Sequence, residues 1–442
     1  MHPRKLPYAI MVVAILGWPL FCAFRYGFHE AVRWYGNGKR VSETAVHSCG
    51  VDPSSDTIVA ARGGAVLLVS AFRDERFAPR TLRVIGIARR AGLPRLYCHI
   101  CTGPSVFTAP AETLFHSDHF DFPYGTVDFL CRVPEKAGRA LQVSVSARQL
   151  PEVREPYLWI REAGRNATGP FPRQFSVCVS TLFGNYSNVL QFVQSMEMYR
   201  LLGAGKVFVY KSDCGPLLRK VLDHYSAEGL LEVVPWEVDR YLRVSNSWKP
   251  SLGPGDLHYH GQIAALNDCL YRNMEASAYV ALVDIDEVIV PRIHDTWGAM
   301  MAFLSSRHLG VESFSFEDAV FRTEVFGDGG RFDLWPRVPG VNVLRHVDRE
   351  PLRPFAFNAR KLMVNPRAVV WTSVHHTLWQ RGASMEVPAS VARMHHCRKR
   401  DDLGVRDSQL VRDTTMWKYS AALVRNVNRT LSRVLGAAGL NP

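Results

Sequence analysis

The sequence predicts an α/β protein in which a sheet with crossover helices follows a small β-rich domain and an N-terminal transmembrane helix. Three observations carry this prediction. The chain opens with a long apolar run, the next hundred residues hold short β-rich runs broken by turn residues, and the second half alternates strand-like and helical segments. At 442 residues the chain exceeds the usual length of one core, so a large domain with a smaller companion is expected.

The N-terminal segment 6–24 is an uncharged, largely apolar stretch, long enough to cross a bilayer as a helix. Arg4 and Lys5 precede it, so the positive-inside tendency keeps a tail of residues 1–5 in the cytosol and places the remainder in the lumen of the secretory pathway. The alternative is a cleaved signal peptide, but no clear small-x-small site follows the run. We therefore expect a single-pass type II anchor at 6–24 and a polar stem over 25–56.

Cysteines and glycosylation sequons agree with a luminal body. Cys98 and Cys101 form a C-x-x-C pair, but no second pair follows at zinc spacing, so structural disulfides or free thiols are the simpler interpretation. Three N-x-S/T sequons, at Asn166, Asn185 and Asn428, also fit the lumen. Outside the apolar run the cysteines are even in number, which permits disulfides without revealing their pairing: Cys49, Cys98, Cys101, Cys131, Cys178, Cys214, Cys269 and Cys397.

The chain is basic, with a formal net charge of +12. Such a charge can indicate nucleic acid binding, but a luminal body does not meet nucleic acid, so we expect no nucleic-acid partner. A basic surface is compatible with a substrate that carries a diphosphate.

The region 57–171 is expected to form the small β-rich domain. Its strand-like runs are broken by Gly, Pro and Arg, and they cover 57–69, 81–87, 127–133 and 141–147. Prolines, a glycine and a sequon interrupt the pattern before Pro172, where we place the domain boundary.

From residue 172 onward the pattern alternates between strands and helices, which predicts a parallel sheet with crossover helices. Gly203 follows a helix and precedes a strand, the wrong order for a phosphate loop, so a helix C-cap is expected there. The large domain is placed at 172–400, followed by a C-terminal helical extension at 401–442. The expected strands are 175–181, 206–210 and 231–234, and the expected helices are 187–202, 216–227 and 260–273.

The most informative stretch is Ala278–Pro291, reading AYVALVDIDEVIVP, where a buried-strand pattern ends in acidic residues. Ligands of α/β sheets bind beyond the carboxyl ends of such strands. In an extended backbone Asp284 and Asp286 point the same way and Glu287 the opposite way. Two carboxylates in a half-buried cleft favour a divalent cation, and their oxygens suit Mn²⁺ or Mg²⁺ bridging to substrate phosphates. The alternative, a solvated acidic turn, is disfavoured by the apolar run before it.

Two other strand ends are expected to line the same crevice. Phe183 and Gly184 follow the first strand, and Gly184 would allow a close approach of backbone and ligand. Tyr210 and Asp213 close the second strand, where an aromatic ring can stack on a base and a carboxylate can bind ribose or sugar hydroxyls. Each of these residues is also compatible with an ordinary polar strand end.

Basic side chains and histidines recur further along the chain. Lys361 opens the segment KLMVNP, His375 lies in the segment VHH, and Arg398 ends the segment RMHHCR. A neutral imidazole can complete a metal site begun by two carboxylates, while Lys361 and Arg398 can neutralise phosphate charge. Paired histidines are also common as satisfied polar groups.

The chain resembles glycosyltransferase family 92 in three ordered segments, VCVSTLFGNYSNVLQFVQSMEMYRLLGAGKVFVYKSD, HGQIAALNDCLYRN and YVALVDIDEVIVP. The resemblance continues through Lys361–Pro366, Val374-His375 and His396-Cys397-Arg398, where the family usually has an aromatic residue in place of Cys397. It covers roughly residues 172–400.

This resemblance implies a GT-A type nucleotide-sugar-binding fold with a Rossmann-like mixed sheet. It also implies a Golgi membrane protein that transfers galactose from UDP-galactose to glycans on glycoproteins. Carried over by motif, Asp284 and Asp286 would bind the metal and the nucleotide, and His375 would complete the metal site. Gln262 would face the donor pocket.

We expect an inverting displacement assisted by Mn²⁺ or Mg²⁺, with a general base near the acceptor hydroxyl. Glu317 and Asp318, on the next expected strand and its exit, are the candidate bases. Two other functions remain open: an inactive luminal glycan-binding protein, and a metal-dependent phosphoryl transferase or hydrolase that uses Asp284 and Asp286. The choice of galactose rests on the resemblance alone, because one inverted hydroxyl separates galactose from glucose.

Overall fold

The computed structural model of the protein describes residues 42–45, 57–63, 65–103, 105–151, 155–161, 170–352, 357–399 and 404–436. The expected tail and anchor, most of the expected stem, Cys49 and Asn166 lie outside these residues. Within the described ranges, no helix combines the length and apolar character needed to span a bilayer.

The first region is built from short strands. They are β1 (Ser42–Ala45), β2 (Val59–Ala60), β3 (Val66–Arg73), β4 (Thr81–Arg89), β5 (Tyr97–Cys101), β6 (Ser105–Pro110), β7 (Glu112–Phe115), β8 (Tyr124–Arg132), β9 (Gln142–Ser146) and β10 (Leu158–Arg161). They pair in the order β6-β5-β9-β10-β3-β4-β8-β7, with β2 on β3. Apolar side chains from β3, β4, β5, β8 and β9 share one core, and a disulfide between Cys98 and Cys131 joins β5 to β8.

The second region holds a central sheet in the order β13-β12-β11-β14-β19-β16-β22. Its strands are β11 (Arg173–Leu182), β12 (Ala204–Lys211), β13 (Leu231–Pro235), β14 (Ser277–Val283), β16 (Val311–Phe316), β19 (Lys361–Val364) and β22 (Ala383–Glu386). The first four run parallel to one another, as expected from the strand and helix alternation. β19 pairs antiparallel with both β14 and β16, so the sheet as a whole is mixed.

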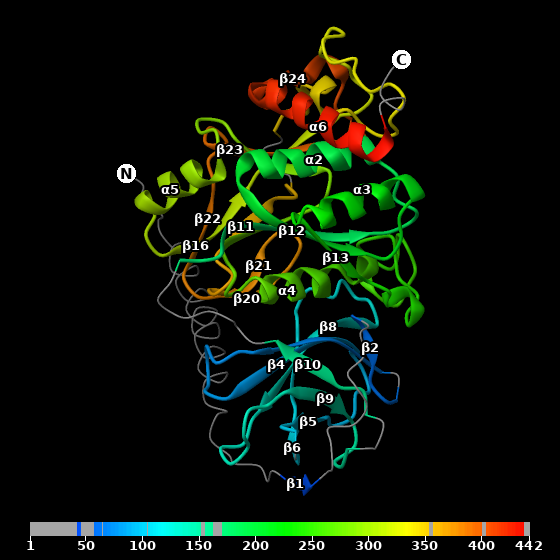
Figure 1. The fold of residues 1–442 in the computed structure, drawn as a ribbon, viewed down its shortest axis with the longest axis vertical. Helices are drawn as coiled ribbons and strands as arrows, with labels where there is room; N and C mark the ends of the chain where they lie inside the picture. The colour runs from blue at the N-terminus through cyan, green and yellow to red at the C-terminus, as the bar shows by residue number, and fades with distance from the viewer. Residues whose placement is uncertain are drawn as a thin grey trace, which may run out of the picture. The chain divides into compact units, whose positions relative to one another are not determined.

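Helices cover both faces of the parallel part of this sheet (Figure 1). The helices are α2 (Val189–Leu202), α3 (Pro216–Ala227), α4 (Gln262–Arg272), α5 (Trp297–Arg307) and α6 (Ser420–Leu435). On β11, Val177 and Val179 share a core with α2 and α3, whereas Cys178 between them shares a core with α4 on the opposite face. The alternation of side chains along a strand thus assigns the two helical layers.

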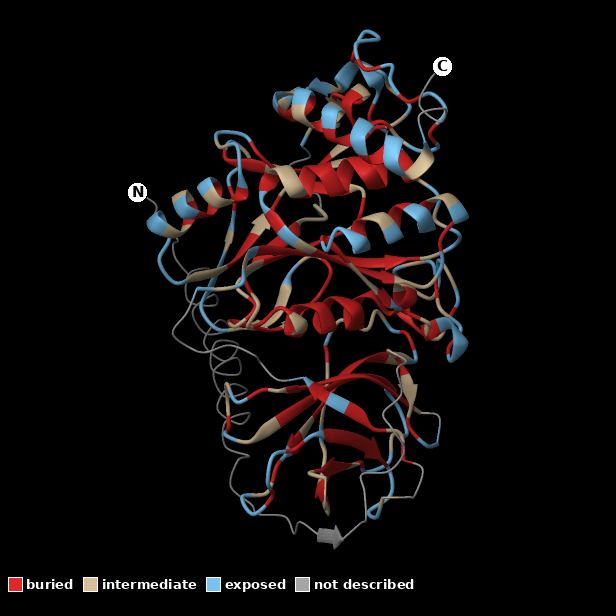
Figure 2. Ribbon diagram, in the orientation of Figure 1, coloured by how far each residue is buried: buried red, intermediate tan, exposed pale blue. Residues whose placement is uncertain are grey.

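Helix α4 lies between the two regions (Figures 1 and 2). Its apolar residues Ala265, Leu266 and Leu270 share a core with Leu67 of β3 and Ile85 of β4. The β-rich region therefore packs directly on the layer that supports the central sheet.

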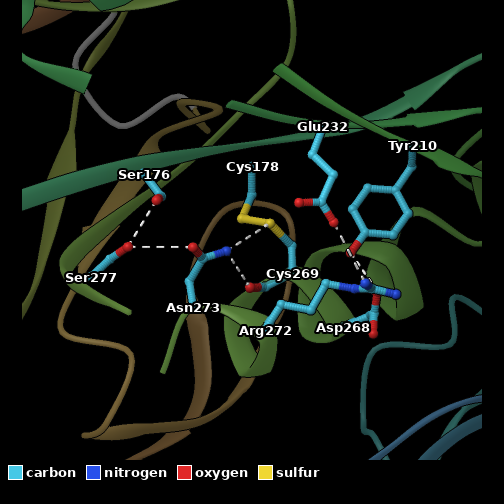
Figure 3. Close-up of a disulfide and its surroundings, with 9 residues drawn as sticks. All are labelled: Ser176, Cys178, Tyr210, Glu232, Asp268, Cys269, Arg272, Asn273 and Ser277. Carbon is cyan, nitrogen blue, oxygen red and sulfur yellow. Dashed lines mark hydrogen bonds and ion pairs between the residues drawn. A yellow bond between two sulfur atoms is a disulfide. The ribbon is translucent and has the colours of Figure 1, made fainter. Parts of the chain in front are cut away.

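A disulfide and a set of buried polar groups fix α4 against the sheet (Figure 3). Cys178 of β11 is bonded to Cys269 of α4. Beside it, Asn273 donates from its side-chain amide to the carbonyl of Cys269 at 2.9 Å. Ser277 on β14 contacts Ser176 on β11 through their hydroxyl groups at 2.8 Å. Cys101 is also disulfide-bonded, whereas Cys214 and Cys397 are free and buried.

A second sheet, in the order β15-β23-β17-β18-β24, continues from the central one. Its strands are β15 (Glu287–Pro291), β17 (Asp318–Arg322), β18 (Asp348–Arg349), β23 (Ala392–Arg398) and β24 (Val411–Arg412). Strands β20 (Val369–Thr372) and β21 (Thr377–Gln380) form a separate pair. The short 3-10 helices are η1 (Val238–Arg240), η2 (His258–Gly261), η3 (Val343–Arg345), η4 (Asp407–Gln409) and η5 (Thr415–Tyr419).

Helix α2 is buried almost throughout because α6 covers it (Figure 2). The buried carboxylate of Glu197 in α2 accepts a hydrogen bond from Tyr225 of α3 at 2.9 Å and one from Thr430 of α6 at 3.2 Å. Gly203 caps α2 with a φ of 105°, which confirms the expected C-cap. Helix α4 begins at Gln262, two residues later than expected, because Tyr259, His260 and Gly261 have positive φ.

Candidate functional site

Two chain segments pass from the central sheet into the second sheet, and acidic residues lie at both crossings. Strand β14 ends at Val283 and β15 begins at Glu287, while β16 ends at Phe316 and β17 begins at Asp318. The first crossing lies at the carboxyl end of the parallel strand β14, where α/β proteins bind their ligands. The fold therefore gathers carboxylates from two separate segments at one edge of the central sheet.

The segment Asp284–Glu287 is a tight turn. The amide of Glu287 donates to the carbonyl of Asp284 at 3.1 Å, and Tyr199 of α2 donates its hydroxyl to the carbonyl of Glu287 at 2.8 Å. The Glu287 carboxylate accepts a hydrogen bond from the amide of Asp284 at 2.7 Å. The expectation that Glu287 points away from the aspartates is therefore wrong, because the extended geometry it assumed ends at Val283.

Lys361 lies at the start of β19 and neutralises part of this turn. Its ammonium contacts Asp284 at 2.7 Å and Glu287 at 3.4 Å, and its side chain is only 3% exposed. The second oxygen of Asp284 accepts a hydrogen bond from Ser180 at 2.5 Å. Burial raises the pKa of Asp284, but Lys361 outweighs it and lowers this pKa to about 2. Burial dominates at Glu287 and raises its pKa to about 8.

His396 is the histidine that contacts the acidic residues. Strand β23 lies between β15 and β17, which sets His396 opposite Glu287 on one side. Its ring nitrogens lie 3.4 Å from Asp286, 3.7 Å from Glu287 and 3.3 Å from Asp318. Burial alone would lower the pKa of His396, but the hydrogen bonds that its ring donates to Asp286 and Asp318 raise it well above the usual range. We call Asp284, Asp286, Glu287, Asp318, Lys361 and His396 the acidic junction.

His375 lies close to this group without joining it. Its Nδ1 contacts the carbonyl of Arg360 at 3.1 Å, which orients the ring. Burial first, and then the positive charge of Lys361, lower the pKa of His375 to about 4, so the ring is neutral at pH 7. Among the described residues no three His, Cys, Asp or Glu side chains converge as a metal site, so the predicted triad of Asp284, Asp286 and His375 is not assembled.

A divalent metal fits this site at Asp286 and not at Asp284. Both carboxylate oxygens of Asp284 are engaged by Ser180 and Lys361. The carboxylate of Asp286 is 32% exposed and contacts His396. Mg²⁺ and similar ions are often held by one or two carboxylates while water and substrate phosphates supply the other ligands. The residues present fit such an ion at Asp286.

The two candidate bases lie on opposite sides of the second crossing. The Asp318 carboxylate belongs to the acidic junction, and its backbone amide donates to Asn358 at 2.8 Å. The Glu317 carboxylate instead accepts from Arg393 at 3.1 Å. Neighbouring residues on a strand face opposite ways, so the chain presents Asp318 and not Glu317 to the site. The prediction of Glu317 as a catalytic residue is therefore corrected.

The ends of β11 and β12 meet beside this junction. Asp213 accepts a hydrogen bond from the amide of Asn185 at 3.2 Å, which joins the two strand exits. Gly184 has a φ of 63°, and a Cβ placed there would meet nothing within 4 Å, so the backbone is open to a ligand. The ring of Phe183 stacks on His260 with centroids 4.1 Å apart. The structure thus brings Phe183, Gly184 and Asp213 together.

Tyr210 does not reach this crevice. Its ring is fully buried, and its hydroxyl donates to Asp268 of α4 at 2.5 Å (Figure 3). Arg272 donates to the same carboxylate oxygen, also at 2.5 Å. The prediction that Tyr210 stacks on a base is therefore wrong, because the side chain lies on the α4 face of β12.

The remaining two predicted residues are Gln262 and Arg398. Gln262 is the first residue of α4 and is nearly buried. Arg398 ends β23 two residues after His396, so both side chains leave the same face of the strand. Arg398 is partly exposed. Neither placement conflicts with a role in binding a phosphorylated donor.

The geometry defines a class of protein: an α/β fold with a parallel core whose ligand site lies at the strand ends and carries a partly exposed acidic turn. Residues 173–433, more than half of the chain, match the model of glycosyltransferase family 92. The chain belongs to glycosyltransferase family 92, as the sequence motifs predicted. The match ends at residue 433, within α6.

Two relatives from Caenorhabditis elegans show how far the similarity extends. The chain is 29% identical to glycosyltransferase family 92 protein F13G3.3 over 202 residues, which cover 44% of this chain and 38% of that protein. It is 30% identical to β-1,4-galactosyltransferase galt-1 over 122 residues, which cover 27% of this chain and 26% of that protein. The matched part spans less than half the length of these curated relatives.

Among solved structures, glucosyl-3-phosphoglycerate synthase from Mycobacterium tuberculosis is 13% identical. The alignment covers 60% of this chain and 80% of that one, at a TM-score of 0.24. A similarity of that size does not support a fold assignment.

Proposed function

We propose that this protein is a metal-dependent hexosyltransferase of the GT-A type that moves galactose from UDP-galactose to a hydroxyl group of a glycan on a glycoprotein, with inversion at the anomeric carbon. One observation carries the proposal: the turn Asp284–Glu287 lies at the carboxyl edge of the parallel strands, inside the region that matches the family. The name of galt-1, a β-1,4-galactosyltransferase, supports galactose as the donor sugar.

The donor would lie across the ends of β11, β12 and β14. The open backbone at Gly184 and the exposed carboxylate of Asp213 are available to the nucleoside at one end. Asp286 lies at the other end, where the diphosphate would lie. Arg398 leaves the same face of β23 as His396 and can neutralise phosphate charge there.

Glycosyl transfer needs a stabilised leaving group and an acceptor hydroxyl that loses its proton. Mn²⁺ or Mg²⁺ held at Asp286 would supply electrostatic stabilisation of the departing UDP. Lys361 fixes the carboxylates of Asp284 and Glu287, and therefore the shape of the turn that presents Asp286. Asp318 is the candidate base, because Glu317 is paired with Arg393 on the other side of the strand.

We also propose a Golgi location with residues 6–24 as a type II anchor. Disulfides at Cys98–Cys131 and Cys178–Cys269 support a luminal body, because such bonds persist in oxidising compartments. Imaging of a tagged full chain with protease protection of the C-terminal part tests this topology.

The experiment that tests the activity uses the full chain with a panel of UDP-sugars, defined N-glycan acceptors, and Mn²⁺ added or chelated. We expect UDP release and a hexose mass increment on the acceptor, with UDP-galactose as the preferred donor and loss of activity on chelation. Glycan binding without UDP release would instead support an inactive glycan-binding protein. Phosphate release without a hexose increment would support a phosphoryl transferase or hydrolase.

A further inference from the structure

The segment that leads into α4 has an unusual backbone. Tyr259 has φ 32° and ψ 62°, His260 has φ 52° and ψ 24°, and Gly261 has a φ of 72°. Glycine adopts such angles freely, but two successive residues with side chains do so only when their surroundings hold them there. Backbone strain of this kind concentrates at functional sites.

Both neighbours of Tyr259 are buried and held by other parts of the fold. His258 stacks on Phe120 of the β-rich region, with ring centroids 4.3 Å apart. His260 stacks on Phe183, and its Nε2 contacts the side-chain oxygen of Asn246 at 2.8 Å.

Backbone contacts hold the same segment. Trp236 donates its indole N–H to the carbonyl of His260 at 2.7 Å. A Cβ at Gly261 would meet Leu257 at 3.0 Å, so the chain passes closely here as well. Four residues from other parts of the chain, Phe120, Phe183, Asn246 and Trp236, therefore hold the segment in its strained form. Tyr259, between the two histidines, stays partly exposed.

The position of Tyr259 places it at the ligand edge of the sheet. Phe183, which clamps His260, follows the last residue of β11, and Gln262 at the start of α4 is only three residues away. Burial, and then the charge of Asp284, raise the pKa of the Tyr259 hydroxyl, which is consistent with a ring close to the acidic junction. At pH 7 the hydroxyl is protonated and can donate a hydrogen bond.

We propose that Tyr259 is a donor-binding residue whose hydroxyl donates a hydrogen bond to the nucleotide-sugar, and that the strained segment His258–Gly261 exists to present it. This inference rests on the proposed function, because it assigns Tyr259 to the donor site of that same reaction. The sequence gives no sign of this role, since the strain becomes visible only in the backbone angles.

Three variants of the full chain test the assignment, assayed for UDP-galactose transfer and for thermal unfolding. Tyr259→Phe should raise the KM for the UDP-sugar about 3- to 10-fold, because that is the net contribution of one hydrogen bond. The kcat and the acceptor KM should stay within about twofold of the wild-type values. Tyr259→Ala should raise the donor KM further. Tyr259→Gly should unfold about 1 to 2 °C above Tyr259→Ala, because both lack the ring and only glycine relaxes at this φ.

Tyr241→Phe is the matched control, because Tyr241 is 41% exposed and its hydroxyl donates to the carbonyl of Ile58 in the β-rich region at 3.3 Å. It should leave the donor KM unchanged. If the wild-type chain transfers sugar and both Tyr259→Phe and Tyr259→Ala keep its donor KM, the assignment is wrong while the proposed function stands. A folded wild-type chain that neither binds UDP by calorimetry nor transfers sugar overturns the proposed function and the assignment together.

Discussion

Two of the buried charge clusters in the described part of the chain differ in where their carboxylates face. One is the acidic junction at the edge of the central sheet. The other joins the β-rich region to the second region, and we call it the inter-region cluster: Asp74, Arg76, Arg83, Asp128, Tyr271 and Trp371.

The three charged side chains at the centre of the inter-region cluster are almost completely enclosed. The side chains of Arg83, Asp74 and Asp128 are only 2%, 1% and 1% exposed. Arg83 contacts Asp74 at 2.8 Å and pairs with Asp128, while Trp371 of β20 donates to Asp128 at 2.6 Å. Each charge has a partner inside the protein, which is the condition under which buried ions are tolerated.

The acidic junction leaves two carboxylates partly open to solvent. Asp284 is 38% exposed and Asp286 is 32% exposed, although Lys361 beneath them is only 3% exposed. Four carboxyl groups there share two basic side chains, Lys361 and His396. Partial exposure and an excess of one charge sign therefore distinguish the ligand site from the structural ion cluster in this fold.

The largest expected effect is a loss of stability when the inter-region cluster is broken at Arg83. Arg83→Met should lower the free energy of unfolding by about 3 to 5 kcal/mol, because two buried carboxylates lose their shared partner. The free energy is measured by denaturant unfolding, and transfer by the folded fraction should keep its donor KM within about twofold. Arg243→Met, at an exposed residue 4.0 Å from Asp256, is the control and should change the free energy by no more than about 0.5 kcal/mol. A wild-type unfolding midpoint for Arg83→Met would contradict the structural role.

The second-largest effect is expected at the acidic junction, where a substitution should lower activity and leave stability almost unchanged. Asp286→Asn should lower kcat/KM for transfer about 10²- to 10³-fold, because the exposed carboxylate that fits the metal is lost. The unfolding midpoint should change little, since the side chain is partly solvated and keeps its size. Asp295→Asn, whose side chain is 92% exposed, is the matched control. Full activity in Asp286→Asn would remove this residue from the reaction.

Local patterns were sufficient to predict much of the architecture. Periodicity and turn chemistry predicted the parallel strands, α3 and the Gly203 cap. The predicted ends of these elements lie within a few residues of the ends in the structure. The position of acidic residues at the end of β14 was also predicted, because an apolar strand that ends in carboxylates is a local signal, but the turn that they form was not. These features need no knowledge of which distant segments pair.

The errors all depend on long-range pairing or on the direction of one side chain. His396 rather than His375 contacts Asp286 because β23 inserts between β15 and β17, and no local pattern reveals that strand order. Tyr210 faces α4 because its place on the strand, one residue before Lys211, puts it on the closed side of the sheet. The sequence shows both motifs, but it does not show which strands pair or which way these two side chains point.

The smallest expected effect is a dependence of stability on pH that comes from Asp128 in the inter-region cluster. Burial raises the pKa of Asp128, but Arg83 and then His116 outweigh it and lower the pKa below its usual value. A carboxyl group with a lowered pKa stabilises the folded state above the unfolded pKa of about 3.8, and this stability is lost as the pH falls through the lower, folded value. The inter-region cluster should therefore weaken below about pH 4.

Asp128→Asn isolates this contribution, because the amide keeps the shape of the side chain and does not titrate. The difference in the free energy of unfolding between wild type and Asp128→Asn should be largest at pH 6 to 7. It should shrink by at most about 1 kcal/mol as the pH is lowered to 3, because a single carboxyl group with an unfolded pKa of about 3.8 contributes no more than that over this range. Denaturant unfolding of both chains across this range measures it, and Asp256→Asn at a partly exposed position is the control. A difference that stays constant with pH would mean that Arg83 does not lower the pKa of Asp128, and the inter-region cluster would then not be the enclosed ion network that the contrast with the acidic junction requires.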